Sequence, residues 1–447
     1  MSPWQLGDVR LSDRAERICE AIATTGSVVL RRVGGTRAGE IAAHRFLDNE
    51  RVSAEAITEA LSVRTLDACA GRRVLVVQDT TEINFAGRDA SRRGLGQAGG
   101  DKSVGFFIHP LIAVDIEEGA VLGLVDAEIW TRAPGPTPNR RRKPFAEKES
   151  ARWLRGMESA SERLSRSTEL IVVGDRESDI YSVFARRPEG AQVIVRACHN
   201  RELACGERLF EAAHGLDELG TSRVAIAAKP GQKARSAEVV LRSGRVRLVK
   251  PSDSIEREDS DSLEINYVEA VEENPPRGVR AVCWRLLTSL PVAGADEAQA
   301  VVRLYRLRWR IEEVFRALKT NGLDLEATQI EAAERLFKLA ALAIAAATRI
   351  VQLVDARDGS PRPASDVADP ALIDAFDAIG KRLEGATERQ KNPHPKASLA
   401  WLSWIVARLG GWNCYYKPPG PKTMATGWKR LASMTSGFML AMAVRDV

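Results

Sequence analysis

Residues 74–79 read VLVVQD and residues 170–175 read LIVVGD, two apolar, largely β-branched runs that each end in an aspartate. Short apolar runs of this kind are typical of strands that are buried on both faces of a sheet. In an α/β sheet, side chains from separate strands converge where the strands end. We therefore expect Asp79 and Asp175 to lie at the same edge of one sheet.

Further elements are predicted around these two strands. Three strands, a helix, a strand, a helix and a strand follow one another, and this order predicts an α/β fold with a mixed sheet. The additional strands are expected at residues 108–115, 121–130 and 193–196, and the helices at residues 147–164 and 180–186.

The pattern divides the chain into three predicted parts. Residues 1–65 have apolar side chains at helical spacing and no strand pattern, so we expect a small helical domain there. Residues 66–355 contain the mixed-sheet core, with a β-rich insertion at about residues 200–290. Residues 356–447 are again predicted to be helical, after the linker-like sequence DARDGSPRP.

A long helix is predicted at residues 297–320, followed by a second at residues 332–355. At about 100° per residue, five polar side chains of the first helix fall within an arc of roughly 80°. They are Tyr305, Arg308, Glu312, Arg316 and Lys319. A solvated stripe would pair several acids with the bases, whereas Glu312 is a lone acid among cations. This arrangement suits one metal ligand beside a polyanion.

Carboxylates gathered at one point repel each other unless a cation neutralises them. Mg²⁺ or Mn²⁺ suits an all-oxygen site, and such ions support reactions at phosphate groups. The ordinary alternative is that each strand-end aspartate caps a turn or the following helix. For Asp79 or Asp175 taken alone, the sequence favours the cap; Glu312 shifts the balance towards a metal site.

Composition limits the function classes. With 447 residues, 44% of them hydrophobic and 28% charged, the chain resembles a soluble globular protein of two to four domains. No apolar run reaches ~18 residues, and the first 25 residues are too polar for a signal peptide, so we expect a cytoplasmic protein without a membrane span. A net charge of +5 permits nucleic-acid binding without proving it. The basic run at residues 140–143 fits a solvated loop or a phosphate-contacting loop equally well.

The six cysteines are scattered, and no two form a CxxC pair. Neither a disulfide framework nor a structural zinc site is expected. Cys198, His199 and Cys205 lie near one another in the sequence, but they make an incomplete zinc ligand set.

The spacing Tyr-x2-Arg-x3-Glu-x6-Lys from Tyr305 to Lys319 resembles the signature of the insertion-sequence-four (IS-four) family of bacterial DDE transposases. QDTT at residues 78–81 resembles the first-aspartate motif of that family, and DRESDI at residues 175–180 resembles the second. ARLGG at residues 407–411 is similar as well, and the resemblance extends over almost the whole chain.

The resemblance implies a ribonuclease-H-like core with a β-strand insertion between the second aspartate and the glutamate. It also implies an N-terminal domain that binds DNA ends and a C-terminal dimerisation region. The implied reaction is Mg²⁺-dependent cut-and-paste transposition, with Mn²⁺ as a substitute. Nicking, hairpin formation, hairpin opening and strand transfer would join the inverted-repeat ends of an insertion sequence to target double-stranded DNA. A homodimer associated with the nucleoid would carry this out.

Residue roles follow from the same resemblance. Asp79, Asp175 and Glu312 match the metal ligands of the family. Tyr305, Arg308 and Lys319 match residues that bind DNA phosphates, and the helix-face pattern adds Arg316 to them. Arg196, after the predicted strand, matches an arginine that contacts DNA, and Trp284 matches a tryptophan that stacks on a flipped base. Arg10 and Arg14 match arginines that recognise the transposon end. Leu11 stands where the family has another arginine, so we expect a different end sequence to be recognised.

Two alternatives remain from the residues. A metal-dependent nuclease of similar fold would cut DNA without joining it. A catalytically silent DNA-binding regulator derived from a transposase is disfavoured, because the three acids are intact.

Overall fold

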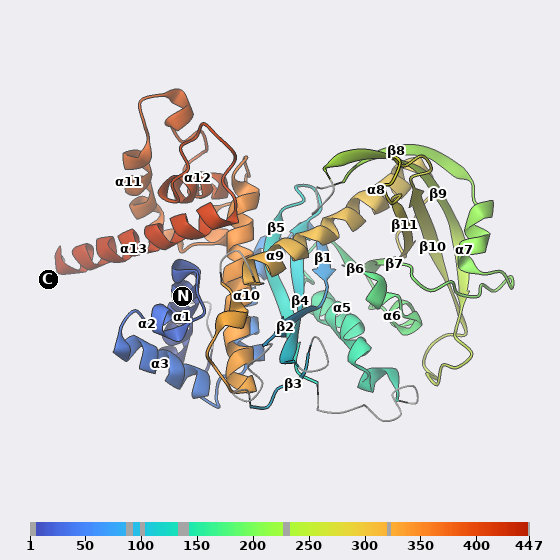
Figure 1. Ribbon diagram of the computed structural model, residues 1–447, viewed down its shortest axis with the longest axis horizontal. Coiled ribbons are helices and arrows are strands. Elements are labelled where there is room, and N and C mark those ends of the chain that lie inside the picture. The colour runs from blue at the N-terminus through green and yellow to red at the C-terminus, as the bar shows by residue number, and fades with distance from the viewer. Residues whose placement is uncertain are drawn as a thin grey trace. The chain divides into compact units, whose positions relative to one another are not determined.

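The computed structural model describes residues 6–85, 93–98, 103–132, 143–226, 233–319 and 323–445. The chain forms two compact units (Figure 1). The first unit comprises residues 1–70, 80–135 and 310–447, and the second comprises residues 71–79 and 136–309. The division into domains at residues 65 and 355 stays a prediction.

The second unit is built on a mixed sheet in the order β1-β6-β7-β11-β10-β9-β8. β1, β6 and β7 are parallel to one another, and the remaining neighbours are antiparallel. The parallel strands are buried along almost their whole length, as their Val- and Ile-rich sequences require. The strands are β1 (Arg73–Gln78), β6 (Glu169–Gly174), β7 (Ala191–Arg196), β8 (Glu218–Ile226), β9 (Arg235–Val249), β10 (Ser262–Val271) and β11 (Cys283–Thr288).

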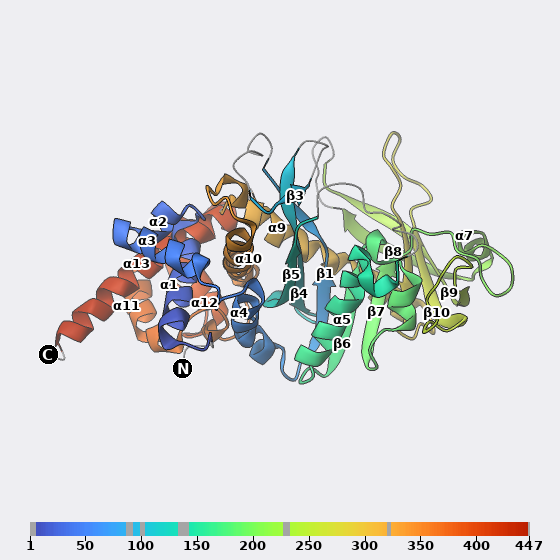
Figure 2. The ribbon, with the colours of Figure 1, turned by 90° about the horizontal axis from the view of Figure 1, so that it is seen from below.

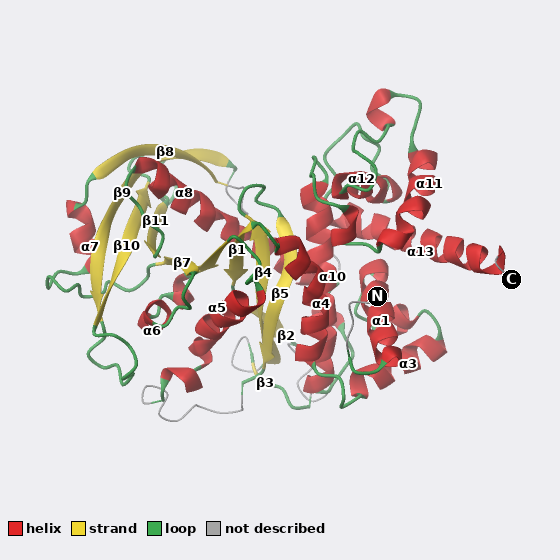
Figure 3. Ribbon diagram, turned by 180° about the vertical axis from the view of Figure 1, so that it is seen from behind, coloured by secondary structure: helices red, strands yellow, loops and turns green. Residues whose placement is uncertain are grey.

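Helices cover this sheet. α8 packs across β7 to β10, and α5 packs against β1 and β6 (Figures 1 and 3). The helices of the second unit are α5 (Arg152–Arg163), α6 (Tyr181–Ala185), α7 (Leu209–Ala212) and α8 (Ala295–Arg306), followed by a 3-10 turn at Leu307–Trp309.

The first unit surrounds α10 (Ala333–Ala356), whose side chains are mostly buried. α10 packs against β5, α4, α1 and α9, while α1 also contacts α13, so both ends of the chain belong to this unit (Figure 2). β4 pairs with β2, β3 and β5. The other helices of the first unit are α1 (Val9–Thr25), α2 (Leu30–Gly34), α3 (Arg37–Asp48), α4 (Ala54–Cys69), α9 (Arg310–Lys319), α11 (Ile373–Leu383), α12 (Leu399–Leu409) and α13 (Pro421–Arg445). The strands of this unit are β2 (Thr81–Asn84), β3 (Gly96–Gln97), β4 (Val104–Asp115) and β5 (Val121–Trp130).

α10 is also long and apolar enough to cross a membrane by length and composition. Most of that apolar stretch is buried within the first unit, which is the pattern of a core helix in a globular protein.

Two expectations about local structure are wrong. The single helix at residues 297–320 is instead α8, a 3-10 turn and α9. The linker-like DARDGSPRP is packed rather than free: Arg362 is 1% exposed and donates a hydrogen bond to the carbonyl oxygen of Val121.

Candidate active site

Asp79 and Asp175 each follow the last residue of a buried parallel strand. β1 and β6 pair in register from Arg73 opposite Glu169 to Val77 opposite Val173. Both aspartates come two residues after the last of these pairs, so they follow the strands at the same carboxyl edge of the sheet. The two apolar runs thus position two carboxylates at one edge of the second unit.

The turn that begins at Asp175 has a fixed local geometry. Oδ1 of Asp175 accepts a hydrogen bond of 2.8 Å from the backbone N–H of Glu177, and the hydroxyl of Ser178 donates to the carbonyl oxygen of Asp175 at 2.6 Å. A Cβ atom on Gly174 would collide with the side chain of Ser178, so this position requires glycine. The capping role weighed from the sequence is real for Asp175, but Oδ2 takes no part in the cap.

Arg308 provides a positive charge beside Asp79 at this edge of the sheet. Its Nη1 donates to Oδ2 of Asp79 at 2.6 Å, and the two side chains are only 11% and 15% exposed. Burial lowers the pKa of Arg308, but Tyr305, Asp79 and Asp175 together outweigh burial and raise it. Nε of Arg308 is buried and has no hydrogen-bond partner among the described residues. The guanidinium therefore supplies the positive charge that two neighbouring carboxylates need.

The rings of Tyr305 and Trp309 lie beside this guanidinium, and Trp284 contacts the ring of Tyr305. Tyr305 in α8 is 3% exposed, and Arg308 lies 6.0 Å from the centre of its ring. The ring of Trp284 meets the ring of Tyr305 edge to face, with 6.3 Å between their centres. Trp284 itself is half-buried on β11, opposite Ala270, so it is not a core residue of the β-rich region. Tyr305 is buried, so its nearest observed role is to hold Arg308 and Trp284 in place.

Arg196 ends β7, as expected from the sequence, and is half-buried. Its Nη2 donates to the carbonyl oxygen of Cys283, the first residue of β11, at 2.9 Å. This bond holds the guanidinium at the boundary between the parallel strands and the antiparallel region. A contact with DNA stays a prediction.

The prediction that five polar residues share one face of a single helix is wrong. Tyr305 belongs to α8 and Arg308 to the 3-10 turn, while Glu312, Arg316 and Lys319 lie in α9. A 3-10 turn advances about 120° per residue instead of about 100°, so angular positions before it do not carry over to α9. The three residues of α9 still share a face at offsets 0, 4 and 7.

Glu312 is half-buried in α9, which belongs to the first unit. Asp79 and Asp175 belong to the second unit. That the three acids form one metal site stays a prediction.

The two arginines predicted to recognise a DNA end lie in α1. Asp8 caps this helix through a hydrogen bond from the backbone N–H of Arg10. Arg10 is exposed and Arg14 is half-buried, and their spacing of four places them on the same face. The basic run also considered from the sequence lies outside the described residues, apart from Lys143.

A group of possible metal ligands does occur around Cys198, although Cys205 is not part of it. The ligand atoms of Asp179, Cys198 and His199 lie within 4.8 Å of one another. However, the carboxylate of Asp179 already accepts hydrogen bonds from the backbone N–H groups of Cys198 and His199 and forms an ion pair with Arg201. Burial and Asp179 raise the pKa of Cys198 to about 11, which disfavours the thiolate that zinc requires. The cluster therefore stabilises a loop.

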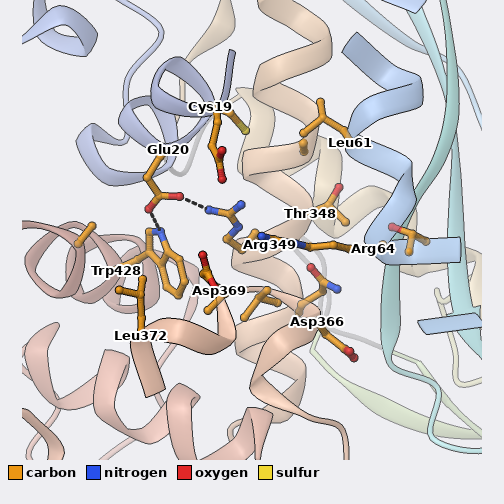
Figure 4. Close-up of a pocket in the computed structure, with 18 of the residues that line it drawn as sticks. Cys19, Glu20, Leu61, Arg64, Thr348, Arg349, Asp366, Asp369, Leu372 and Trp428 are labelled. Atoms are coloured by element: carbon orange, nitrogen blue, oxygen red, sulfur yellow. Dashed lines mark hydrogen bonds and ion pairs between the residues drawn. The ribbon is translucent and has the colours of Figure 1, made fainter. Parts of the chain in front are cut away.

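The first unit encloses a cavity of about 360 Å³ between α1, α4, α10 and α13 (Figure 4). Within it, Arg349 pairs with Glu20 at 2.6 Å, and Nε1 of Trp428 donates to the same carboxylate at 3.0 Å. The residues that line the cavity include none of the predicted site residues.

A family model for the transposase DDE domain matches residues 108–349. The match spans 349 − 108 + 1 = 242 of the 447 residues, more than half of the chain. It includes Asp175 and Glu312, while Asp79 precedes it. The chain belongs to this family of transposases, and its mixed α/β architecture is consistent with a ribonuclease-H-like core. Enzymes with this domain act on DNA and generally use divalent metal ions.

Proposed function

We propose that this DDE transposase catalyses cut-and-paste transposition of an insertion sequence, with Asp79, Asp175 and Glu312 as its metal ligands. The observation that carries the proposal is the placement of Asp79 and Asp175 at one edge of the sheet, with Arg308 bound to Asp79. Two acids that follow adjacent parallel strands and share a buried cation fit a site built for positive charge.

The donor set suits Mg²⁺, with Mn²⁺ as a substitute, because all of its ligand atoms are carboxylate oxygens. Oδ2 of Asp175 lies outside its cap, and Arg308 already offsets the charge of Asp79. When bound, the metal would activate an attacking oxygen and stabilise the leaving 3′ oxygen. Asp79 and Asp175 hold it on the rigid end of the sheet.

Chain connectivity supports Glu312 as the third ligand. Glu312 lies four positions after Arg308, and four extended residues span at most about 14 Å. A carboxylate tethered this closely to the Asp79–Arg308 pair can complete the site. Arg308, Arg316 and Lys319 then bind phosphates of the DNA beside the carboxylates, and Tyr305 holds Arg308 in place.

The finer features come from the resemblance to the IS-four family and, within it, to the transposase of the Tn-five transposon. In this proposal Trp284 stacks on a base that leaves the helix while a hairpin forms at the transposon end. Its half-buried position beside Tyr305 supports that role, because a ring with an accessible face can hold a base without regard to sequence. Arg196 contacts the same DNA.

We also propose that Arg10 and Arg14 read the transposon end. Both lie on one face of α1, and Arg10 is exposed. An arginine that pairs with guanine contributes about 1–3 kcal/mol of discrimination. In a titration with the inverted repeat and with random DNA, Arg10→Ala should weaken binding to the repeat more than binding to random DNA. Equal weakening would leave phosphate contact as its only role.

A homodimer is proposed on the resemblance alone. The apolar helix α12 gives no support of its own, because ten of its eleven residues are buried within the first unit. Two DNA ends of different length, mixed with the full chain, test the dimer directly. A complex that contains both lengths supports it, and complexes that contain one end each contradict it.

The central experiment uses the full chain, Mg²⁺ and a DNA fragment that carries the inverted repeats flanking its gene. Joined products in target DNA support the transposase. Cutting without joining would favour the nuclease alternative, and binding without cutting would favour the silent regulator.

A further inference from the structure

We infer that Arg310 and Asp355 form an anchor that sets the position of Glu312 by fixing the first turn of α9. The inference rests on the proposed role of Glu312 as a metal ligand. All contacts that carry it lie within the first unit. Arg310 and Asp355 are positioning residues, since neither is expected to touch the metal or the DNA.

Arg310 is the first residue of α9, and its guanidinium has three partners. Nε donates to the carbonyl oxygen of Gly119 at 2.9 Å, in the turn between β4 and β5. Nη1 lies 2.9 Å from Oε2 of Glu313 and 3.1 Å from Oδ1 of Asp355. The first turn of α9 is thereby tied both to a β-turn and to the end of α10.

Asp355 is itself held in place. Its side chain is 5% exposed, and Oδ2 accepts a hydrogen bond of 2.8 Å from the backbone N–H of Val121 at the start of β5. The carbonyl oxygen of Val121 accepts a bond from the buried Arg362 on its other side. Asp355 therefore joins α9 to the place in the first unit where β5 packs against α10.

The interruption before α9 explains why an anchor is needed. α8 ends at Arg306 and a 3-10 turn follows, so no continuous helical hydrogen-bond ladder fixes where α9 begins. The buried side chains Ile311, Val314 and Leu318 hold α9 against α10, but apolar contacts alone are non-directional. Directional bonds from Arg310 can fix the rotation of the helix about its axis.

The geometry of the helix links Arg310 to Glu312. Two residues apart at about 100° each, they point to nearly opposite sides of α9. Holding the Arg310 side against the β4–β5 turn therefore directs the Glu312 side away from it. Catalytic groups must be held within about 0.5 Å, and a 1 Å error can cost about 10²-fold in rate.

Mn²⁺ binding by the full chain tests the anchor, with the free ion followed by electron paramagnetic resonance. Asp355→Asn keeps the shape of the side chain and an oxygen for Val121 but removes the charge that Arg310 binds. Residues that orient metal ligands typically change metal affinity about 10–100-fold when mutated. We expect the Mn²⁺ dissociation constant to rise by about tenfold in Asp355→Asn and in Arg310→Gln. The double variant should be no weaker than either single variant, because both remove one anchor.

A matched control is Arg349→Gln, which removes an ion pair between α10 and α1 that involves neither α9 nor Asp355. It should lower the melting temperature and leave the Mn²⁺ dissociation constant unchanged. Glu312→Gln separates the two hypotheses. If it does not weaken Mn²⁺ binding, the proposed metal site is wrong. If it does, while Asp355→Asn and Arg310→Gln bind Mn²⁺ like the natural chain, the anchor is wrong. Equal weakening in Arg349→Gln would also overturn the anchor, because general destabilisation would then explain all three variants.

Discussion

Two of the aspartate–arginine pairs, one in each compact unit, can be compared by the groups that surround their carboxylates. In the second unit, Asp79 receives Arg308 at the end of β1, and Asp175 follows the adjacent strand. In the first unit, Asp355 receives Arg310 and also accepts the backbone N–H of Val121.

In the proposed site, this difference separates a metal-binding aspartate from a structural one. Asp175 uses Oδ1 for its cap, and Oδ2 takes no part in it, whereas both oxygens of Asp355 are engaged by groups of its own unit. Asp355 is also more deeply buried than Asp79. An aspartate beside an arginine is thus not by itself a sign of a metal site; the number of oxygens left for a ligand decides.

The largest effect is expected from Asp175→Asn. Loss of one metal ligand should reduce DNA cleavage by at least ~10³-fold, because metal assistance contributes several kcal/mol to such a reaction. DNA binding in a gel-shift titration should stay within about threefold of the natural chain. The rate of DNA cleavage by Asp355→Asn, measured in parallel, should fall by about 10–100-fold. Equal losses in the two variants would erase the distinction between the two pairs.

Arg308→Gln should reduce cleavage by about 10²-fold, the typical effect of removing one donor that stabilises developing charge. It also leaves the Asp79 carboxylate without its guanidinium partner, so the melting temperature should fall in the absence of Mg²⁺ and recover when Mg²⁺ is added. Arg310→Gln should show no such recovery. A melting temperature of Arg308→Gln that does not respond to Mg²⁺ would contradict the proposed site.

Trp284→Ala tests the aromatic neighbour of the Asp79–Arg308 pair. Stacking on a base contributes about 1–3 kcal/mol, so the hairpin step should slow by about 5–150-fold while the first nick is little affected. A fully buried tryptophan would cost ~3–5 kcal/mol of stability, whereas half-buried Trp284 should cost less. Single-turnover analysis of nicks and hairpins, together with a melting curve, separates the two roles. Equal loss of both steps with a large drop in melting temperature would make Trp284 structural.

The smallest effect is a pH dependence of stability at Asp355. Burial is the main cause that raises its pKa from 3.8 to about 6; Glu313 raises it further, and Arg310, the Val121 N–H and Arg362 oppose the shift. The folded chain therefore binds this proton more tightly than the unfolded chain, and the contribution of Asp355 to stability falls as pH rises from about 4 to about 6. A shift of about two units corresponds to at most ~3 kcal/mol.

Melting curves between pH 4 and pH 7 measure this effect. Relative to Asp355→Asn, the melting temperature of the natural chain should fall by a few degrees as pH rises from about 4 to about 6. It should then remain level up to pH 7. A difference that stays constant with pH would show that Asp355 does not titrate there.

The sequence was most informative where apolar residues follow one another without interruption. The apolar runs before Asp79 and Asp175 predicted two buried strands, and the structure contains them as β1 and β6. β5 coincides with its predicted range, since its apolar pattern is bounded by a turn sequence. The short strands β2 and β3 were missed, because two to four residues carry too little periodicity to be recognised.

The helix interruption between Arg306 and Arg310 could not be predicted, because that segment contains neither proline nor glycine. Only long-range contacts account for it. Arg308 binds Asp79, which lies 229 residues earlier, and Arg310 binds Gly119 and Asp355. Arg308 and Arg310, two positions apart, are thus each held by partners far away in the sequence.

The sequence by itself therefore determined the buried strands β1 and β6 and the acids that follow them, and it carried the resemblance at Tyr305, Arg308, Glu312 and Lys319. Local periodicity and spacing are enough for these, because each depends on residues close together in the chain. Only the tertiary structure decided which carboxylates have an oxygen to spare, which arginine neutralises which acid, and that Asp355 belongs to the scaffold. Those properties depend on burial and on partners more than two hundred residues apart, and no local pattern encodes them.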